Sequence, residues 1–214
     1  GGVGRQQLPQ VAAPHKKGGR VTRYFEADGL PLAYDDVGEG EPVVLLHGFA
    51  ADRRLNWKLP GWYDVLTNAG YRVLALDARG HGQSAKPSDV EAYRPDGIAG
   101  DAIRLLDHLG LRKACLFGYS MGGRNAAWLL ARHGRRFRAV VIGGTGLNLL
   151  APADARRWAK RGFPLTRDNA NTESLAVPAM VPLYRRALQR GGRTGALAAC
   201  LMGAFPNLRK ADFA

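Results

Sequence analysis

Residues 114–133 decide the fold, and they read ACLFGYSMGGRNAAWLLARH. The opening ACLFG is a short apolar run, which is typical of a strand buried on both faces of a sheet. The closing part places Ala126, Leu129 and Leu130 on one stripe of a helix. Ser120 lies between the two parts, with a glycine two residues away on either side. The pattern therefore predicts a strand, a sharp turn at Ser120 and a helix.

The segment Gly118-Tyr119-Ser120-Met121-Gly122 has the form of a nucleophile elbow. In such an elbow a serine occupies a strained turn from strand to helix, and small residues on either side let the turn approach its neighbours closely. The free N–H groups and the positive dipole end of the following helix stabilise negative charge that develops beside the serine. We therefore expect Ser120 to be a nucleophile and the Met121 N–H to be a donor of an oxyanion hole.

From residue 20 onward, short apolar runs alternate with amphipathic stretches, which predicts a mostly parallel sheet flanked by helices. Six runs read as strands: RVTRYFEADG and LPLAYDDVGEG, a hairpin around Asp-Gly, then PVVLLHG, YRVLALD, ACLFGYS and AVVIGG. Two helices are predicted between the strands, one with the apolar stripe Ala102, Leu105, Leu106 and Leu109 before Gly110, the other from about Gly122 to His133.

The ends of the chain differ in character from this core of residues 20–146. Residues 1–19 have no initiator Met and much Gly, Gln and Lys, which indicates a disordered basic leader or the edge of an incomplete reading frame. After Gly146 charge-rich helices follow, and no further strand is visible; one helix carries Leu197, Cys200, Leu201 and Ala204. We interpret residues 147–214 as a helical cap region, with the chain ending before the remaining core.

The net charge of +13 is unevenly distributed along the chain. Residues 1–23 hold five Lys or Arg and no acid, and residues 150–214 hold eleven against four acids, so these ends contribute +5 and +7. The stretch between them contributes only +1. The excess is mostly Arg in a chain rich in Ala, Gly and Arg, and no nucleic-acid motif accompanies it. We therefore expect no nucleic-acid partner.

Cys115 and Cys200 lie far apart in apolar runs, which favours buried free thiols over a disulfide and hence a reducing compartment. The sequence has no apolar run of about 18 residues and no hydrophobic stretch of a secretory signal near its start. We expect a cytoplasmic protein without a membrane segment. No metal-ligand spacing is visible, and GGTG at 143–146 lacks the form of a dinucleotide turn, so no cofactor is expected.

Three motifs occur in a fixed order: VVLLHGFA at 43–50, LALDARGHGQSAKP at 74–87 and LFGYSMGG at 116–123. With them the chain resembles the α/β-hydrolase superfamily, and within it the capped esterase, haloperoxidase-like and C–C hydrolase group. The resemblance covers residues 20–214 and implies an eight-stranded sheet, with the nucleophile after the fifth strand and a cap after the sixth. It also implies a second oxyanion-hole donor after the third strand, the N–H of Phe49, with that of Ala50 as a further candidate.

In that family the triad's acid commonly follows the seventh strand and its histidine the eighth. This chain ends at Ala214, so we expect the last two strands to be absent and both residues to lie beyond it. The histidines present are expected to be structural: His47 and His81 in turns, His108 and His133 near helix C-termini, and His15 in the leader.

Three other residues could be mistaken for the triad's acid. Asp77 ends a strand at the catalytic edge, and capping of the following ARGHG turn explains it more simply. Asn148 cannot serve as a carboxylate, and Asp154 opens a helix that reads as solvated. We expect none of the three to be the acid.

The sequence thus favours a serine hydrolase in which Ser120 attacks the carbonyl of a small-molecule substrate, most simply a carboxylic ester. Serine rather than aspartate at the elbow argues against the dehalogenase and epoxide-hydrolase branches, while perhydrolase and C–C hydrolase roles stay open. The alternative is a catalytically incomplete fragment or a non-enzymatic binding protein, because the acid and the histidine are missing and the sheet keeps an unpaired edge. The substrate and the oligomeric state are left undetermined.

Overall fold

The computed structural model describes residues 22–145 and 194–203. Its six-stranded sheet has the order β1-β2-β4-β3-β5-β6. The strands are β1 (Arg23–Ala27), β2 (Leu30–Val37), β3 (Glu41–Leu46), β4 (Tyr71–Leu76), β5 (Ala114–Tyr119) and β6 (Phe137–Gly143). All six predicted strands are confirmed.

The sheet begins with the predicted hairpin and then becomes parallel. Asp28 and Gly29 both have positive φ, 53° and 73°, as a tight two-residue turn between β1 and β2 requires. β1 pairs with β2 and β2 with β4 in antiparallel register, whereas β3 pairs in parallel with β4 and β5, and β5 with β6. The carboxyl ends of these four parallel strands therefore meet at one edge.

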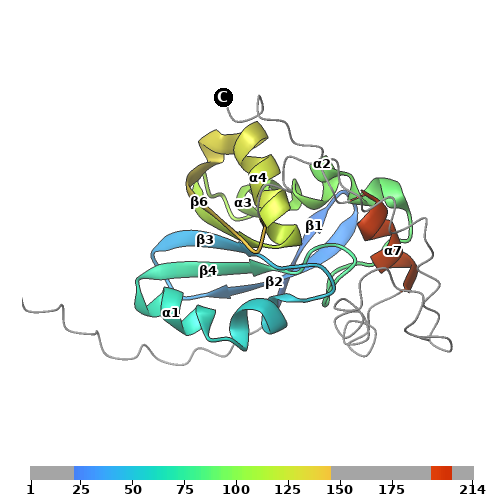
Figure 1. The fold of residues 1–214 in the computed structure, drawn as a ribbon. Coiled ribbons are helices and arrows are strands. Elements are labelled where there is room, and N and C mark those ends of the chain that lie inside the picture. Colours follow the sequence, from blue (N-terminus) through green and yellow to red (C-terminus); the bar gives the residue numbers. More distant parts are fainter. Residues whose placement is uncertain (1–21, 146–193, 204–214) are drawn as a thin grey trace, which may run out of the picture.

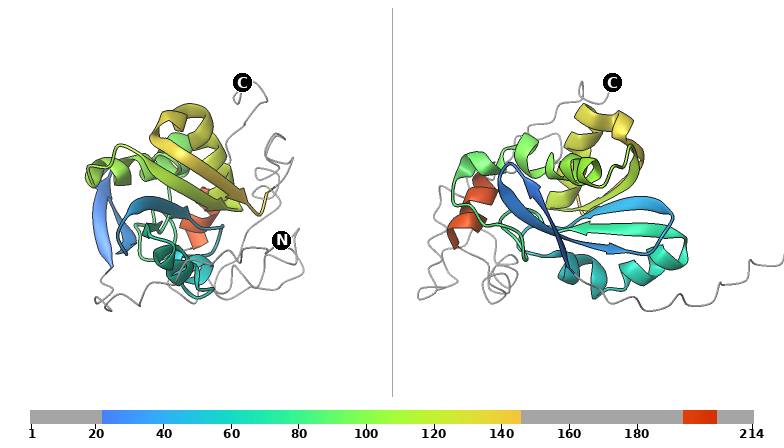
Figure 2. Two further views of the ribbon diagram at one scale, coloured as in Figure 1. Left: turned by 90° about the vertical axis from the view of Figure 1, so that its left-hand side faces the viewer. Right: turned by 180° about the vertical axis from the view of Figure 1, so that it is seen from behind.

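Helices cover both faces of the sheet (Figures 1 and 2). Between β3 and β4 lie η1 (Arg54–Lys58), a π-helical turn, and α1 (Trp62–Asn68). Between β4 and β5 lie η2 (Val90–Tyr93), α2 (Pro95–Ile98) and α3 (Asp101–His108). Between β5 and β6 lie α4 (Met121–His133) and η3 (Gly134–Arg136), and α7 (Thr194–Gly203) follows later in the chain. α3 and α4 lie on the face opposite α1.

The two helices predicted between strands are confirmed as α3 and α4, and Gly110, with φ 66°, follows the end of α3. One residue of the α4 stripe was predicted wrongly. Leu130 is 39% exposed, whereas Ala126 and Leu129 are buried. The helix expected around Leu197 is confirmed as α7. The leader and most of the expected cap lie outside the described residues.

Apolar residues alternate in β3 so that both faces of the sheet are packed. Val44 and Leu46 join the core under α3 and α4, together with Leu105, Leu116 and Leu129 among others. Val43 and Leu45 join the opposite core, with Trp57 and Tyr63 from the η1 and α1 region. β3 is thus buried on both sides, as its continuous apolar run predicts.

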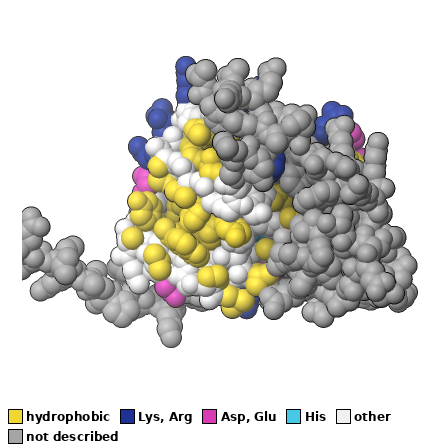
Figure 3. Space-filling model, viewed as in Figure 1, with side chains coloured by type: hydrophobic (Ala, Val, Ile, Leu, Met, Phe, Trp, Pro, Cys, Tyr) yellow, Lys and Arg dark blue, Asp and Glu magenta, His cyan; other side chains and the backbone are white. Residues whose placement is uncertain are grey.

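In the described part of the sheet, β6 is an edge strand. Its Val141 is 52% exposed, and Tyr119 at the end of the neighbouring β5 is 47% exposed. Figure 3 shows apolar side chains gathered on this side of the molecule. No helix in residues 22–145 and 194–203 has the length and apolar character that crossing a membrane requires.

Candidate active site

Ser120 lies on the turn between β5 and α4, at the carboxyl edge of the parallel strands. Its backbone has φ 54° and ψ −111°, a conformation that L residues other than glycine rarely adopt. Its N–H donates to Gly143 O at 2.8 Å, which ties the turn to the end of β6. The predicted sharp turn is confirmed, and the surrounding hydrogen bonds hold Ser120 in this strained geometry.

The glycines of the elbow are required by close backbone contacts. A Cβ on Gly118 would lie 2.1 Å from Gly122 O, and one on Gly122 would lie 2.0 Å from Leu46 O. A Cβ on Gly123 would lie 2.8 Å from Gly143 O. The elbow therefore packs directly against β3 and β6 with no room for a side chain.

The loop after β3 lies beside Ser120. A Cβ on Gly48 would be 3.4 Å from Ser120 Cβ, so the two backbones are close neighbours. The loop forms a turn in which Ala51 N–H donates to Gly48 O at 3.2 Å and Ala50 takes a positive φ of 59°. Gly122 N–H donates to His47 O at 3.1 Å and connects the elbow to this loop.

Some backbone N–H groups around Ser120 donate to protein acceptors, and others do not. Gly48 N–H donates to the Asn56 side chain at 2.9 Å, and Gly122 N–H is used by His47 O. Within the described residues, the N–H groups of Phe49, Ala50, Met121 and Gly123 have no protein acceptor. Met121 begins α4, where the helix leaves its first N–H groups without internal partners. Of the two predicted oxyanion-hole donors, Met121 directly follows Ser120, and Phe49 follows Gly48, which adjoins Ser120.

The side chains of both candidate donors are anchored in one apolar cluster over the carboxyl edge. Phe49 and Met121 are buried there together with Tyr93, Leu197 and Cys200, among others, the last two from α7. Cys200 Sγ lies 3.7 Å from Met121 Sδ, and burial raises the pKa of its thiol. Neither cysteine forms a disulfide; Cys200 is buried as expected, whereas Cys115 is only partly buried.

His47 and His81 make contacts beside the loop that follows β3. Ala78 N–H donates to His47 Nε2 at 3.1 Å, which leaves Nδ1 to donate to Gly48 O at 2.8 Å. The His81 ring packs 5.2 Å from the His47 ring and 5.6 Å from the Phe49 ring, centroid to centroid. Its Nδ1 lies 3.1 Å from Arg79 O, while its buried Nε2 has no hydrogen-bond partner among the residues that the structure describes.

The other two described histidines also have contacts of their own. His108 ends α3 and stacks against Phe25 at 5.7 Å, and His133 ends α4 and packs against Trp128 at 5.6 Å. None of the hydrogen bonds within residues 22–145 and 194–203 joins a histidine to the Ser120 hydroxyl. His15, Asn148 and Asp154 lie outside the described residues.

Burial of the His81 ring makes stability depend on pH. Burial above all, then the neighbouring His47, lowers the pKa of His81 from 6.5 to about 3. Because the pKa of His81 is lower in the folded than in the unfolded state, its neutral ring contributes fully to the free energy of unfolding above pH 6.5. This contribution is lost as the pH falls from 6.5 toward 3. We expect the wild type to lose about 2 kcal/mol more than His81→Asn between pH 6.5 and 5, measured by urea unfolding at both pH values.

Asparagine is chosen because its amide can still donate to Arg79 O, and the other titrating groups are shared by both proteins and cancel in the comparison. Equal pH dependence of unfolding in the two proteins would show that His81 does not titrate in this way.

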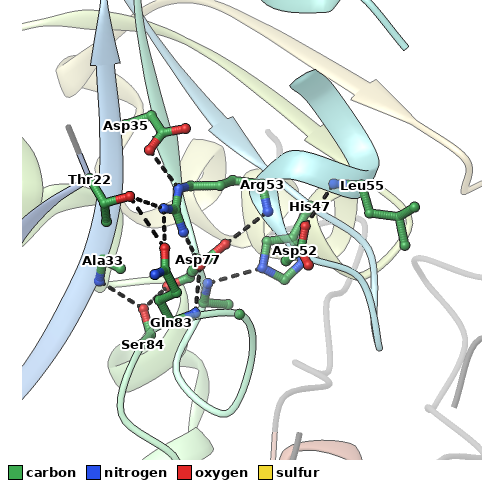
Figure 4. Close-up of polar contacts among 12 residues, drawn as sticks. Thr22, Ala33, Asp35, His47, Asp52, Arg53, Leu55, Asp77, Gln83 and Ser84 are labelled. Carbon is green, nitrogen blue, oxygen red and sulfur yellow. Dashed lines mark hydrogen bonds and ion pairs between the residues drawn. The ribbon is translucent and has the colours of Figure 1, made fainter. Parts of the chain in front are cut away.

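Asp77 is the centre of a buried polar network that the sequence did not reveal (Figure 4). It accepts hydrogen bonds from Arg53 N–H and Gln83 N–H, each at 2.8 Å, and forms an ion pair with the Arg53 guanidinium. The Gln83 bond closes the ARGHG turn, as expected for Asp77. Arg53 is the residue that sequence reasoning missed, because it lies in a polar loop sequence typical of the surface. Among the described side chains, no group of three or more His, Cys, Asp or Glu could hold a metal ion.

Comparison with known proteins gives a consistent picture. A sequence profile described as alpha/beta hydrolase fold matches residues 41–177. The chain is 41% identical over 121 residues to a non-heme chloroperoxidase of Kitasatospora aureofaciens, covering 54% of this chain and 40% of that protein. It is 38% identical over 137 residues to 3-oxoadipate enol-lactonase 2 of Acinetobacter baylyi, covering 63% and 48%. The chain thus spans less than half the length of these curated relatives.

A solved structure of a hydrolase from Pseudomonas aeruginosa superposes with a TM-score of 0.68 and 24% identity, covering 88% of this chain and 73% of that chain. At this identity the superposition supports the fold alone.

Proposed function

Because the chain belongs to the α/β-hydrolase fold family, we propose that it is the Ser120-bearing part of a serine hydrolase acting on a carboxylic ester. The observation that carries the proposal is the strained backbone of Ser120, with φ 54° at the carboxyl edge of the sheet. Such strain persists where surrounding structure imposes it, and it is a recurrent feature of functional residues.

In the proposed reaction, Ser120 Oγ attacks the ester carbonyl carbon and its proton passes to a base. The carbonyl oxygen becomes an oxyanion that accepts hydrogen bonds from Phe49 N–H and Met121 N–H. Collapse of this intermediate expels the alcohol and leaves the acyl group on Ser120, and water then releases the acid. The proposed base is a histidine other than the four described, since those rings are engaged elsewhere.

One further observation supports an ester as the substrate class. The relative from Acinetobacter is named as an enol-lactonase, and a lactone is a cyclic ester. A cytoplasmic location is proposed on the free state of both cysteines.

The proposal is tested by covalent labelling of the protein that the natural reading frame containing these residues encodes. A fluorophosphonate should react with a single serine, and peptide mapping should locate the adduct on Ser120. Labelling of another serine, or none, would contradict the proposal.

A matched assay tests where the base lies. We expect residues 1–214 alone to hydrolyse a short-chain p-nitrophenyl ester no faster than about 10³ to 10⁴ times the uncatalysed rate, the level that binding and an oxyanion hole can supply without a complete triad. The rate of p-nitrophenol release is measured for residues 1–214 and for the protein encoded by the natural reading frame, and the two rates are compared. Efficient, Ser120-dependent turnover by residues 1–214 would mean that a base lies within them and that the assignment of the histidines is wrong.

A further inference from the structure

Arg53 and Asp77 form a two-point connection between two loops at the carboxyl edge. Arg53 ends the loop after β3, and Asp77 directly follows β4. The Arg53 backbone N–H donates to Asp77 Oδ1 at 2.8 Å, and its guanidinium Nη1 donates to Oδ2. Arg53 is 2% exposed and Asp77 is fully buried. Because main chain and side chain are both bound, the position and the orientation of Arg53 are fixed.

The remaining guanidinium donors of Arg53 are also used (Figure 4). Nε donates to Asp35 Oδ1 at 2.8 Å, while Nη2 donates to Thr22 Oγ1 at 2.7 Å and Gln83 Oε1 at 2.6 Å. These partners come from the antiparallel side of the sheet and from the loop after β4. A lysine ammonium cannot reproduce this planar set of contacts.

The start of the same loop is connected to the residue after Asp77. Ala78 N–H donates to His47 Nε2 at 3.1 Å, and His47 Nδ1 donates to Gly48 O. Residues 47–53 are therefore attached at both ends to residues 77–78. Phe49, whose N–H is the proposed oxyanion donor, lies between the two attachments, and Gly48 adjoins Ser120.

We propose that Arg53 and Asp77 are positioning residues that hold the loop of residues 47–53 so that the Phe49 N–H faces the carbonyl attacked by Ser120. The inference rests on the proposed function above. Buried ion pairs add little net stability compared with apolar residues of similar size, because desolvation offsets their attraction. Orientation of a loop beside the nucleophile is a role that an apolar substitute could not fill.

The chain provides a matched control for the effect of a buried arginine. Arg79 is also 2% exposed and also binds two aspartates, Asp101 at 2.8 Å through Nε and Asp28 at 3.2 Å. Its side chain makes none of the contacts that attach residues 47–53. Arg53→Lys and Arg79→Lys therefore each remove a forked contact from a buried guanidinium to two carboxylates, although Asp28 is itself half exposed. Only Arg53→Lys is expected to release the loop.

The experiment compares three proteins expressed from the natural reading frame: the wild type, Arg53→Lys and Arg79→Lys. Circular dichroism first verifies that each of them is folded. The maximal rate of fluorophosphonate labelling and the half-saturating probe concentration are measured separately, together with hydrogen exchange of residues 48–53. We expect Arg53→Lys to lower the maximal rate between about tenfold and 100-fold with little change in half-saturation, since loss of one oxyanion donor costs about 10² to 10³. Exchange in the loop should rise at least about tenfold, and Arg79→Lys should change neither.

The possible outcomes separate this inference from the proposed function. Equal effects of the two variants on labelling and on loop exchange would overturn the positioning role and reduce Arg53 to a contributor to stability. Absence of Ser120 labelling in the wild type, with faster loop exchange only in Arg53→Lys, would refute the serine hydrolase while retaining the attachment of the loop. Slower labelling together with faster exchange of residues 48–53 in Arg53→Lys, with neither change in Arg79→Lys, supports both the positioning role and the proposed function.

Discussion

Ser120→Ala and Ser120→Gly are both expected to reduce fluorophosphonate labelling and ester turnover by at least about 10³-fold, because the proposed nucleophile is removed in each. Their stabilities should differ. Alanine keeps a Cβ in the backbone conformation with φ 54° and should leave the free energy of unfolding within about 0.5 kcal/mol of wild type. Glycine relieves a strain of about 1–3 kcal/mol and adds about 0.5–1 kcal/mol of unfolded-state entropy, so a net gain of about 1 kcal/mol is expected.

The measurement is urea unfolding of the three proteins alongside the labelling assay. A glycine variant less stable than the alanine variant would show that the turn at Ser120 is not strained. Residual labelling in the alanine variant would assign the nucleophile elsewhere. The comparison thus tests whether the strained backbone at Ser120 lowers the free energy of unfolding of the wild type.

Gly122→Ala is expected to destabilise the fold by at least about 3 kcal/mol. The added Cβ would lie 2.0 Å from Leu46 O, 2.5 Å from Leu46 C and 2.8 Å from His47 O. All three atoms belong to the backbone at the end of β3, which is paired on both sides and cannot shift as a flexible side chain would. Separation of α4 from β3 would also break the bond from Gly122 N–H to His47 O.

Gly134→Ala is the control for this substitution. Gly134 follows α4 with φ −51°, and an added Cβ would meet only Leu130 Cδ1 at 3.8 Å. We expect a change between zero and a stabilisation of about 0.5 kcal/mol, from reduced unfolded-state freedom and partial cover of Leu130. Thermal and urea unfolding measure both variants. Similar stabilities of Gly122→Ala and Gly134→Ala would contradict the close approach of the elbow to β3.

The elements around Ser120 could be predicted because their signals are local. A continuous apolar run such as PVVLL specifies a strand with two buried faces, and Ala102, Leu105 and Leu106 specify one helix face. The turn at Ser120 is equally local, since its glycines occur within two residues of it. Met121 and Phe49 could be nominated as donors from the same short motifs, and their role in the reaction stays a prediction.

The Arg53 network could not be predicted because its members are far apart in the sequence. Asp35 lies on β2, Arg53 after β3 and Asp77 after β4, and they meet only where β3 and β4 end beside the antiparallel strand β2. Each residue alone reads as a polar loop or strand-end residue. Burial of all three depends on pairing between the charges, which no single segment of sequence displays.

By itself, then, the sequence determined the order of the strands and helices, the sharp turn at Ser120 and the family, because hydrophobic periodicity and glycine spacing act over a few residues. Only the tertiary structure decided which N–H groups near Ser120 lack an acceptor among the described residues, and which described histidines have other contacts. It also decided that Arg53 and Asp77 attach the loop containing Phe49. Hydrogen-bond partners of this kind are chosen by the packing of distant segments. Their identity is therefore a property of the assembled sheet edge rather than of any one motif.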